Sequence, residues 1–165
     1  MEKVEPYTVR PWLPWYVGVQ KKYLNQVGQR PTWDESFMME ACLAALRATC
    51  LKRHVGAVAV KERHLIATGY NGSPAGHPHC LEEGCEIIEG KCERTTHGEA
   101  NLVASAASLG VSLKGSTVYV CWPPCDKCVH LLIGAGVVEV VYLGELKERS
   151  RYLLDRSKIL HRRLG

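Results

Sequence analysis

The sequence predicts an α/β fold in which helices cover both faces of a partly parallel sheet. Segments rich in β-branched residues alternate with segments whose apolar residues recur at helical spacing, an order typical of α/β domains. Residues 137–143 are apolar almost throughout, as expected for a strand that is buried on both faces. At 165 residues, the chain is long enough for one domain with a single substantial core.

The composition is that of a globular protein rather than a disordered, fibrous or membrane protein. Apolar residues make up 46% of the chain and charged residues 23%, close to the averages for globular domains. No apolar run approaches the length of a membrane span, and the first residues lack the basic and then apolar pattern of a secretory signal. We therefore expect a cytoplasmic protein without a membrane partner.

The net charge of +4 is mild for a protein that binds nucleic acid. Basic residues gather between Arg149 and Arg163, but they do not form an aromatic-interleaved stripe. A solvated helix face is the simpler interpretation of this basic segment, and a phosphate or partner contact is the alternative. We expect a small-molecule substrate and no polymeric nucleic acid.

Residues 1–31 form an extension whose composition differs from the rest of the chain. Pro6, Pro11, Pro14 and Pro31 lie among tyrosines and tryptophans, a combination that favours neither a long helix nor a simple strand. We expect these aromatic side chains to pack on the domain or on a neighbouring subunit. Residues 32–165 are expected to form the functional domain.

Helix and strand signals then follow in order along this domain. Thr32 and Glu35 fit a capping box, and apolar residues recur at helical spacing as far as about Cys50. Two β-branched segments, 55–60 and 64–69, predict a hairpin. The remaining expected elements are a loop over 72–91, a helix over 98–109, a strand over 117–122, a helix over 124–133, a strand over 137–143 and a helix from 145 to about 160.

The cysteines indicate a metal site. Disulfides are rare in a reducing compartment, so the eight cysteines are expected to be metal ligands, nucleophiles or small buried residues. Cys125 and Cys128 form a Cys-x-x-Cys motif where a helix is expected to begin, and the helix dipole there favours the thiolates that a metal needs. His97 stands at the start of another expected helix. Three protein ligands leave the fourth tetrahedral position of zinc open, as in a catalytic site.

Glu99 follows His97 by two positions and enters the same site from the first turn of the helix. A carboxylate beside an open zinc position can move a proton without being a ligand. We therefore expect Glu99 to be catalytic. A lone Cys-x-x-Cys would also fit a redox protein, but His-x-Glu followed by Pro-Cys-x-x-Cys is the signature of zinc nucleobase deaminases.

From about residue 33 to 143, the chain resembles the deoxycytidylate (dCMP) deaminases of the zinc-dependent cytidine deaminase superfamily, close to the bacterial competence-operon and phage type. Besides the two zinc motifs, the resemblance is carried by three segments. They are Val-Gly-Ala-Val at 55–58, Gly-Tyr-Asn-Gly-Ser-Pro-Ala-Gly at 69–76 and Gly-Ser-Thr-Val-Tyr-Val at 115–120.

The resemblance implies a three-layer α/β/α sandwich with a mixed five-stranded sheet. It implies the hydrolytic deamination of dCMP to dUMP and ammonia, with His97, Cys125 and Cys128 as ligands of the catalytic zinc and Glu99 as the proton shuttle. It further implies a homohexamer with dCTP and dTTP as effectors and with magnesium accompanying the effector.

A second group of cysteines indicates a structural zinc. The long loop after the hairpin carries Cys80, Cys85 and Cys92, and Cys50 at the end of the first helix would supply a fourth thiol. Four soft ligands without an open position describe a structural site, and phage-type family members are similar in using cysteines at the places of Cys50 and Cys80. His79 in place of one cysteine is a variant, and reduced, solvent-facing thiols are the alternative.

The substrate contacts are less sharply defined by the sequence. The resemblance places Asn71 against the deoxyribose. For the 5′-phosphate, Arg53, Ser73 and Arg94 lie in suitable segments, and other basic residues or a neighbouring subunit could serve equally.

One departure from the family pattern bears on the substrate. The family often has a tyrosine shortly after the last apolar strand, where this chain has Leu146 or Glu145 near the expected position. Trp122 is a candidate for the missing aromatic wall, with core packing as the alternative. The alternatives to dCMP are a modified dCMP, a free cytidine nucleoside, or adenosine in RNA, against which the missing basic groove counts. Outside enzymes, the alternative is a zinc-stapled binding or assembly protein, against which the intact Glu99 counts.

Overall fold

A computed structural model describes residues 10–24 and 28–165 of the chain, and its centre is a five-stranded sheet in the order β2-β1-β5-β6-β7. Strand β1 pairs antiparallel with both β2 and β5, whereas β5, β6 and β7 are parallel to one another. The strands are β1 (Gly56–Lys61), β2 (His64–Tyr70), β5 (Thr117–Val120), β6 (Glu139–Tyr142) and β7 (Leu160–Arg163).

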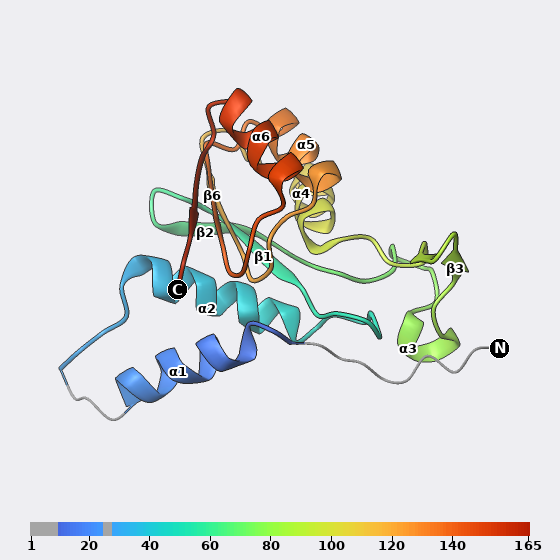
Figure 1. The fold of residues 1–165 in the computed structure, drawn as a ribbon, viewed down its shortest axis with the longest axis horizontal. Coiled ribbons are helices and arrows are strands. Elements are labelled where there is room, and N and C mark those ends of the chain that lie inside the picture. Colours follow the sequence, from blue (N-terminus) through green and yellow to red (C-terminus); the bar gives the residue numbers. More distant parts are fainter. Residues whose placement is uncertain (1–9, 25–27) are drawn as a thin grey trace.

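Helices cover both faces of this sheet (Figure 1). On one face, α2 (Trp33–Ala45) packs against β1, and α1 (Leu13–Leu24) lies outside α2. The opposite face carries α4 (Gly98–Ser108), α5 (Asp126–Gly134) and α6 (Glu148–Arg156). The three-layer α/β/α sandwich with a mixed five-stranded sheet is therefore confirmed.

A small subdomain extends from one end of the sandwich (Figure 1). It contains the short helix α3 (Cys80–Glu83) and a two-stranded sheet of β3 (Ile87–Ile88) and β4 (Lys91–Cys92). Sequence patterns predicted only a loop for most of this region. Elements this short bury little apolar area, so they leave no periodic pattern of their own.

Helix α2 begins as the sequence predicts. The Thr32 side chain accepts a hydrogen bond from the Glu35 backbone N–H, and the Glu35 carboxylate accepts one from the Thr32 backbone N–H. The helix ends at Ala45 rather than near Cys50. The following residues turn so that the Thr49 N–H donates to the Asn71 carbonyl, which ties the end of α2 to the end of β2.

The expectation that residues 1–31 contain no long helix was wrong for the 12 residues of α1. Pro14 lies in the first turn of α1, where a missing N–H costs no intrahelical hydrogen bond. The expected packing of the aromatic residues on the domain is confirmed for Trp12, which is 1% exposed and belongs to the core. Pro6 and the rest of residues 1–9 lie outside the described residues.

The C-terminal prediction of one helix up to about residue 160 was also wrong. Helix α6 ends at Arg156, and β7 adds a fifth strand parallel to β6. The Arg162 guanidinium donates to both carboxylate oxygens of Asp34 at 2.7 Å and to Glu139 at 2.8 Å. This edge strand is held by ion pairs, so it lacks the apolar alternation by which strands are recognised.

No helix within residues 10–24 and 28–165 combines the length and apolar character that a membrane span needs.

Two glycines of the sheet, Gly56 and Gly69, allow helices α2 and α4 to pack closely against it. A Cβ atom on Gly56 of β1 would lie 2.2 Å from the Ala41 carbonyl oxygen of α2. A Cβ atom on Gly69 of β2 would lie 2.3 Å from the Gly98 carbonyl oxygen and 2.4 Å from the Leu102 nitrogen of α4. The backbone of each helix therefore rests directly on a strand.

We expect Gly69→Ala to destabilise the fold by about 3 kcal/mol or more, because the clash is with backbone and overpacking of this kind costs about 1–3 kcal/mol even where side chains can yield. Gly18→Ala is the matched control. Gly18 lies inside α1, and an added methyl group there would meet no neighbouring atom of the described residues within 4 Å, so the change should be neutral or stabilise by up to about 1 kcal/mol. Urea unfolding of both variants checks the pair, and an unchanged midpoint for Gly69→Ala would contradict the close approach.

Candidate metal centre and active site

Two helix starts bring three potential metal ligands together. His97 is the N-cap residue of α4, Cys125 is the N-cap residue of α5, and Cys128 lies in the first turn of α5. The Nδ1 atom of His97 lies 3.5 Å from the Cys125 Sγ and 3.4 Å from the Cys128 Sγ. All three ligand atoms lie within 4.8 Å of one another.

These distances fit tetrahedral zinc. With Zn–S bonds of about 2.3 Å and Zn–N bonds of about 2.0 Å, a tetrahedral ion separates a sulfur ligand from a nitrogen ligand by roughly 3.5 Å. Both His97–sulfur distances agree with this value. The donor set of one imidazole and two thiols also suits zinc and leaves one coordination position for a water or substrate.

The charge state of the cluster favours a cation. Hydrogen bonds from Cys128 and from His97 lower the pKa of Cys125 to about 4. The hydrogen bond with Cys125 in turn raises the pKa of Cys128, since the two thiols share one negative charge, and burial adds to this effect. A hydrogen bond to Cys125 raises the pKa of His97. A divalent ion would balance both thiolates and release the imidazole from its proton.

Glu99 lies in the first turn of α4, beside this cluster, and is only 3% exposed. Burial raises the pKa of Glu99 above the ordinary range of a glutamate. A buried carboxyl group with a raised pKa is suited to accept a proton and to give it up again during a reaction. The position of Glu99 therefore fits a general acid and base rather than a surface carboxylate.

The cluster opens into a pocket of about 730 Å³, a volume within the range of small-molecule sites. His97, Cys125 and Glu99 form part of its wall, together with segments that follow α2, β4 and β5. Most of the cations in the wall were not singled out by sequence reasoning, although each lies next to a motif residue. The pocket cations are Lys52, Arg53, Lys91, Lys127 and Lys147.

Asn71 lines this pocket, but both ends of its side chain are also used within the fold. Its Oδ1 accepts a hydrogen bond from the Val55 N–H at 2.7 Å, and its Nδ2 donates to the Arg53 carbonyl at 2.7 Å. Asn101, which sequence reasoning missed, donates to the Tyr70 carbonyl from α4. The sequence feature that could have pointed to Asn101 is an amide side chain within an Ala-rich helical segment.

The other predicted substrate contacts separate into two groups. Arg53 and Trp122 line the pocket, and the Arg53 guanidinium carbon lies 4.3 Å from the centroid of the Trp122 ring. Ser73 and Arg94 are not among the pocket-lining residues of the described chain. The Ser73 hydroxyl donates to the Pro78 carbonyl, and Arg94 forms an ion pair with Glu83.

Leu146, at the position where a stacking tyrosine was considered, is buried in the hydrophobic core. Its neighbours Glu145 and Lys147 line the pocket. The side chain that presents an aromatic face to this pocket is therefore Trp122 rather than one at position 146.

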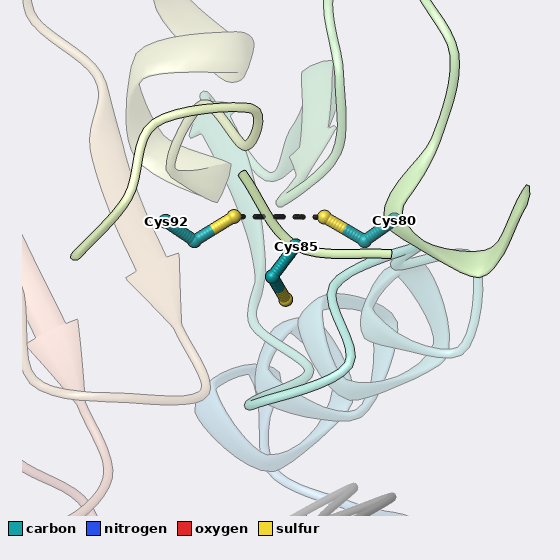
Figure 2. A group of neighbouring side chains, drawn as sticks. All are labelled: Cys80, Cys85 and Cys92. Carbon is teal, nitrogen blue, oxygen red and sulfur yellow. Dashed lines mark hydrogen bonds between the residues drawn. The ribbon is translucent and has the colours of Figure 1, made fainter. Parts of the chain in front are cut away.

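A second cluster of thiols lies in the small subdomain. Cys80, Cys85 and Cys92 place their sulfur atoms within 4.8 Å of one another, and Figure 2 shows the side chains of Cys80 and Cys92 pointing toward each other. Their sulfur atoms are 3.6 Å apart, close to the roughly 3.8 Å between two thiolates on tetrahedral zinc. The Thr95 hydroxyl lies 3.2 Å from the Cys80 Sγ.

The thiols of this cluster differ in their ionisation. Burial raises the pKa of Cys80 and raises that of Cys85 to about 12. Burial also opposes ionisation of Cys92, but hydrogen bonds from Thr95 and Cys80 lower the pKa of Cys92 overall. Three thiolates at this spacing would repel one another, so a bound cation is the condition under which all three ionise together.

The two residues considered as a fourth ligand lie apart from the three clustered thiols. Cys50 is in neither ligand group; its Sγ accepts a hydrogen bond from the Lys52 N–H at 3.4 Å, and it lines the same pocket as Cys92. His79 places its Nδ1 3.1 Å from the Thr49 hydroxyl.

Comparison with known proteins agrees with this geometry. The family model of the cytidine and deoxycytidylate deaminase zinc-binding region matches residues 31–144. ComE operon protein 2 of Bacillus subtilis is 41% identical over 119 residues, which cover 72% of this chain and 63% of that protein. The deoxycytidylate deaminase of Mycobacterium phage D29 is 37% identical over 127 residues, which cover 70% of this chain and 98% of the phage protein.

A solved structure is similar over most of the fold. The dCMP deaminase of the cyanophage S-TIM5, determined in complex with dCMP and dUMP, matches with a TM-score of 0.72 and 28% identity. The match covers 82% of this chain and 99% of the phage chain. The chain spans slightly less than two thirds of the Bacillus relative but nearly all of both phage proteins. On these matches, the chain belongs to the cytidine and deoxycytidylate deaminase family.

Proposed function

We propose that this protein catalyses the hydrolytic deamination of dCMP to dUMP and ammonia. The observation that carries the proposal is the joining of His97, Cys125 and Cys128 at two helix starts, with the buried carboxyl group of Glu99 beside them. The phage relatives, which this chain matches over nearly their whole length, are named as deaminases of dCMP. The same arrangement supports a modified dCMP or a free cytidine nucleoside as alternative substrates.

His97, Cys125 and Cys128 would hold the catalytic zinc. When bound, zinc lowers the pKa of a water molecule toward neutrality and so supplies a nucleophile at this position. Glu99 would accept a proton from the attacking water molecule at its buried carboxylate and deliver it to ring nitrogen 3 of the pyrimidine. It would then take the second proton of that water, from the hydroxyl group now bonded to carbon 4, and pass it to the amine, so that the carbon–nitrogen bond breaks and ammonia leaves. The raised pKa of Glu99 suits both directions of transfer.

Arg53 and Asn71 would bind the nucleotide. The Arg53 guanidinium stands in the pocket wall, close to the ring of Trp122, and a planar guanidinium matches a phosphate with two hydrogen bonds. Asn71 retains one amide hydrogen and one lone pair beyond its backbone partners, and these suit a deoxyribose hydroxyl. Ser73 and Arg94 would serve indirectly, through the loop that they hold.

Cys80, Cys85 and Cys92 would hold a second, structural zinc. Their spacing supports this assignment, and Cys50 would complete a four-cysteine site after a change in its side-chain orientation. His79 is the alternative fourth ligand.

Further properties of the proposal come from resemblance to the family. They are a homohexamer, regulation by dCTP and dTTP with magnesium, and a place in the cytoplasm. The exposed apolar side chains of Leu43 and Leu46 near the end of α2 agree with burial in an assembly.

Purified, zinc-loaded protein is expected to release ammonia from dCMP, and Glu99→Gln is expected to lower kcat by at least about 100-fold, the lower part of the range for general acid–base catalysis. Glu99→Gln should keep its zinc, because the carboxylate is not among the clustered ligands. Ammonia release and metal content are measured on both proteins with dCMP, CMP, deoxycytidine, cytidine and dCTP. A fully active Glu99→Gln variant would overturn the role of Glu99. Zinc-loaded wild-type protein that deaminates none of these compounds would favour the binding role.

The zinc content of cysteine variants tests the two proposed metal sites independently. Metal analysis of dialysed protein should give two equivalents per chain for the wild type and one each for Cys125→Ser and Cys92→Ser. Only Cys92→Ser should retain deaminase activity, at a reduced level because Cys92 and its neighbours line the pocket. Cys42→Ala, in the core on α2, is the control that should keep both ions. If the wild type held only one equivalent of zinc and Cys92→Ser held the same amount, the thiols of the second cluster would be shown to be free.

Arg53→Gln is expected to lower kcat/KM for dCMP by about 10- to 100-fold, since hydrogen bonds to a charged group contribute about 1.5–3 kcal/mol. The value for deoxycytidine, which has no phosphate, should change little. Arg63→Gln is the matched control, because Arg63 also packs on a tryptophan, Trp33, but does not line the pocket. Steady-state kinetics with both substrates would contradict the assignment if the two values fell together.

A further inference from the structure

The segment from Arg53 to Val55 is a rim of the active-site pocket that other parts of the chain hold in place. Arg53 and Val55 line the pocket. Asn71 binds two peptide groups of this segment, through the Arg53 carbonyl and the Val55 N–H, both at 2.7 Å. The carbonyl of His54, between them, is bound by a residue from outside the region that matches the family.

That residue is Trp12 in the N-terminal extension. Its indole Nε1 donates to the His54 carbonyl at 2.9 Å, across 42 positions of sequence, and the side chain is 1% exposed. The family model begins only at residue 31, so this contact is added to the family domain by the extension. A buried carbonyl that loses such a donor incurs a desolvation penalty or shifts to find another partner.

The backbone of the rim is therefore fixed at three successive residues, and it carries the Arg53 side chain. The guanidinium is placed on the Trp122 ring at 4.3 Å, a contact that is weak at an exposed site and cannot by itself hold a misplaced backbone. A shift of the rim by a fraction of an ångström would be passed to the tip of this long side chain. Accurate placement of Arg53 therefore depends on the backbone contacts beneath it.

We propose that Trp12 is a positioning residue for the active site, and that the N-terminal extension acts through the His54 carbonyl to place Arg53 for binding of the substrate phosphate. This inference rests on the proposed nucleotide substrate. It gives residues 10–24 a role in substrate affinity that the family domain alone does not supply.

Trp12→Phe removes the indole N–H and keeps an aromatic ring in the core. We expect it to weaken dCMP binding and to raise KM for dCMP by about 3- to 10-fold, the effect of one net hydrogen bond of about 0.5–1.5 kcal/mol. The value of kcat should stay the same, because His97 and Glu99 lie at the start of α4. Deoxycytidine binding should also stay the same, since it has no phosphate for Arg53 to bind.

Trp15→Phe is the matched control, because Trp15 lies in the adjoining helix α1 and packs on the core without a hydrogen bond to the rim. Arg53→Gln combined with Trp12→Phe should bind dCMP no more weakly than Arg53→Gln alone, because Trp12 acts through Arg53. Thermal unfolding of each variant shows how much of any effect is loss of stability.

Zinc-loaded Glu99→Gln protein and the Glu99→Gln/Trp12→Phe double variant are each titrated with dCMP and with deoxycytidine in a calorimeter. This experiment tests the inference separately from the proposed reaction. Weaker binding of dCMP alone supports the inference even if the wild type shows no turnover. Equal weakening of both ligands, unchanged dCMP binding, or additive effects of the Trp12 and Arg53 changes would overturn it.

Discussion

The active site depends on the direct packing of α4 on β2, where two backbones meet with no side chain between them. Gly69 allows the contact from the strand, and Gly98 repeats it at the helix start, where an added Cβ would lie 3.0 Å from the Val55 carbonyl oxygen. This approach fixes the first turn of α4, and with it His97 and Glu99, against the ends of β1 and β2. Because α5 begins directly after the loop that follows β5, its Cys125 and Cys128 reach the same place from the neighbouring strand. The ligand distances are thus a consequence of sheet packing rather than of loop conformation.

This geometry places a thiol with a lowered pKa beside a carboxyl group with a raised pKa. Hydrogen bonds from Cys128 and from the His97 imidazole lower the pKa of Cys125, as its place at a helix start also favours, while burial raises the pKa of Glu99. A cation between the sulfur atoms and the imidazole relieves the shared charge of the two thiols, so metal binding and the stability of the two helix starts are linked. Glu99 gains from the same ion, since a nearby positive charge favours its carboxylate. Glu99 and the three clustered side chains would therefore act as one electrostatic unit under the proposed function.

The sequence predicts the parts of this site that depend on local spacing. His97, Glu99, Cys125 and Cys128 stand at helix starts that can be recognised from the sequence, and the structure brings them together. The missed elements depend on contacts between distant residues. Strand β7 has exposed, charged residues and is held by Arg162 against Asp34, 128 positions away, so no local pattern marks it. Likewise, the hydrogen bond between Trp12 and His54 has no signature in either segment, and the two backbone partners of Asn71 can be seen only once the strand ends are placed.

The small subdomain buries little apolar surface, so its order must come from something other than a hydrophobic core. Strands β3 and β4 contain two residues each, and Ile87 and Ile88 are both exposed, so apolar burial contributes little to its stability. Yet part of the wall of the active-site pocket is formed by Gly90, Lys91, Cys92, Glu93 and Thr95. A wall that contacts a substrate must hold its position, and the three clustered thiols lie where they can fix the hairpin to α3. Cross-linking by an ion would supply the order that a hydrophobic core supplies elsewhere in the fold, because each ligand that is held removes conformational freedom from the loop. Under the proposed assignment, the two groups of cysteines would meet different physical needs: one would present chemistry at helix starts, and the other would order a segment with little apolar burial that lines the same pocket.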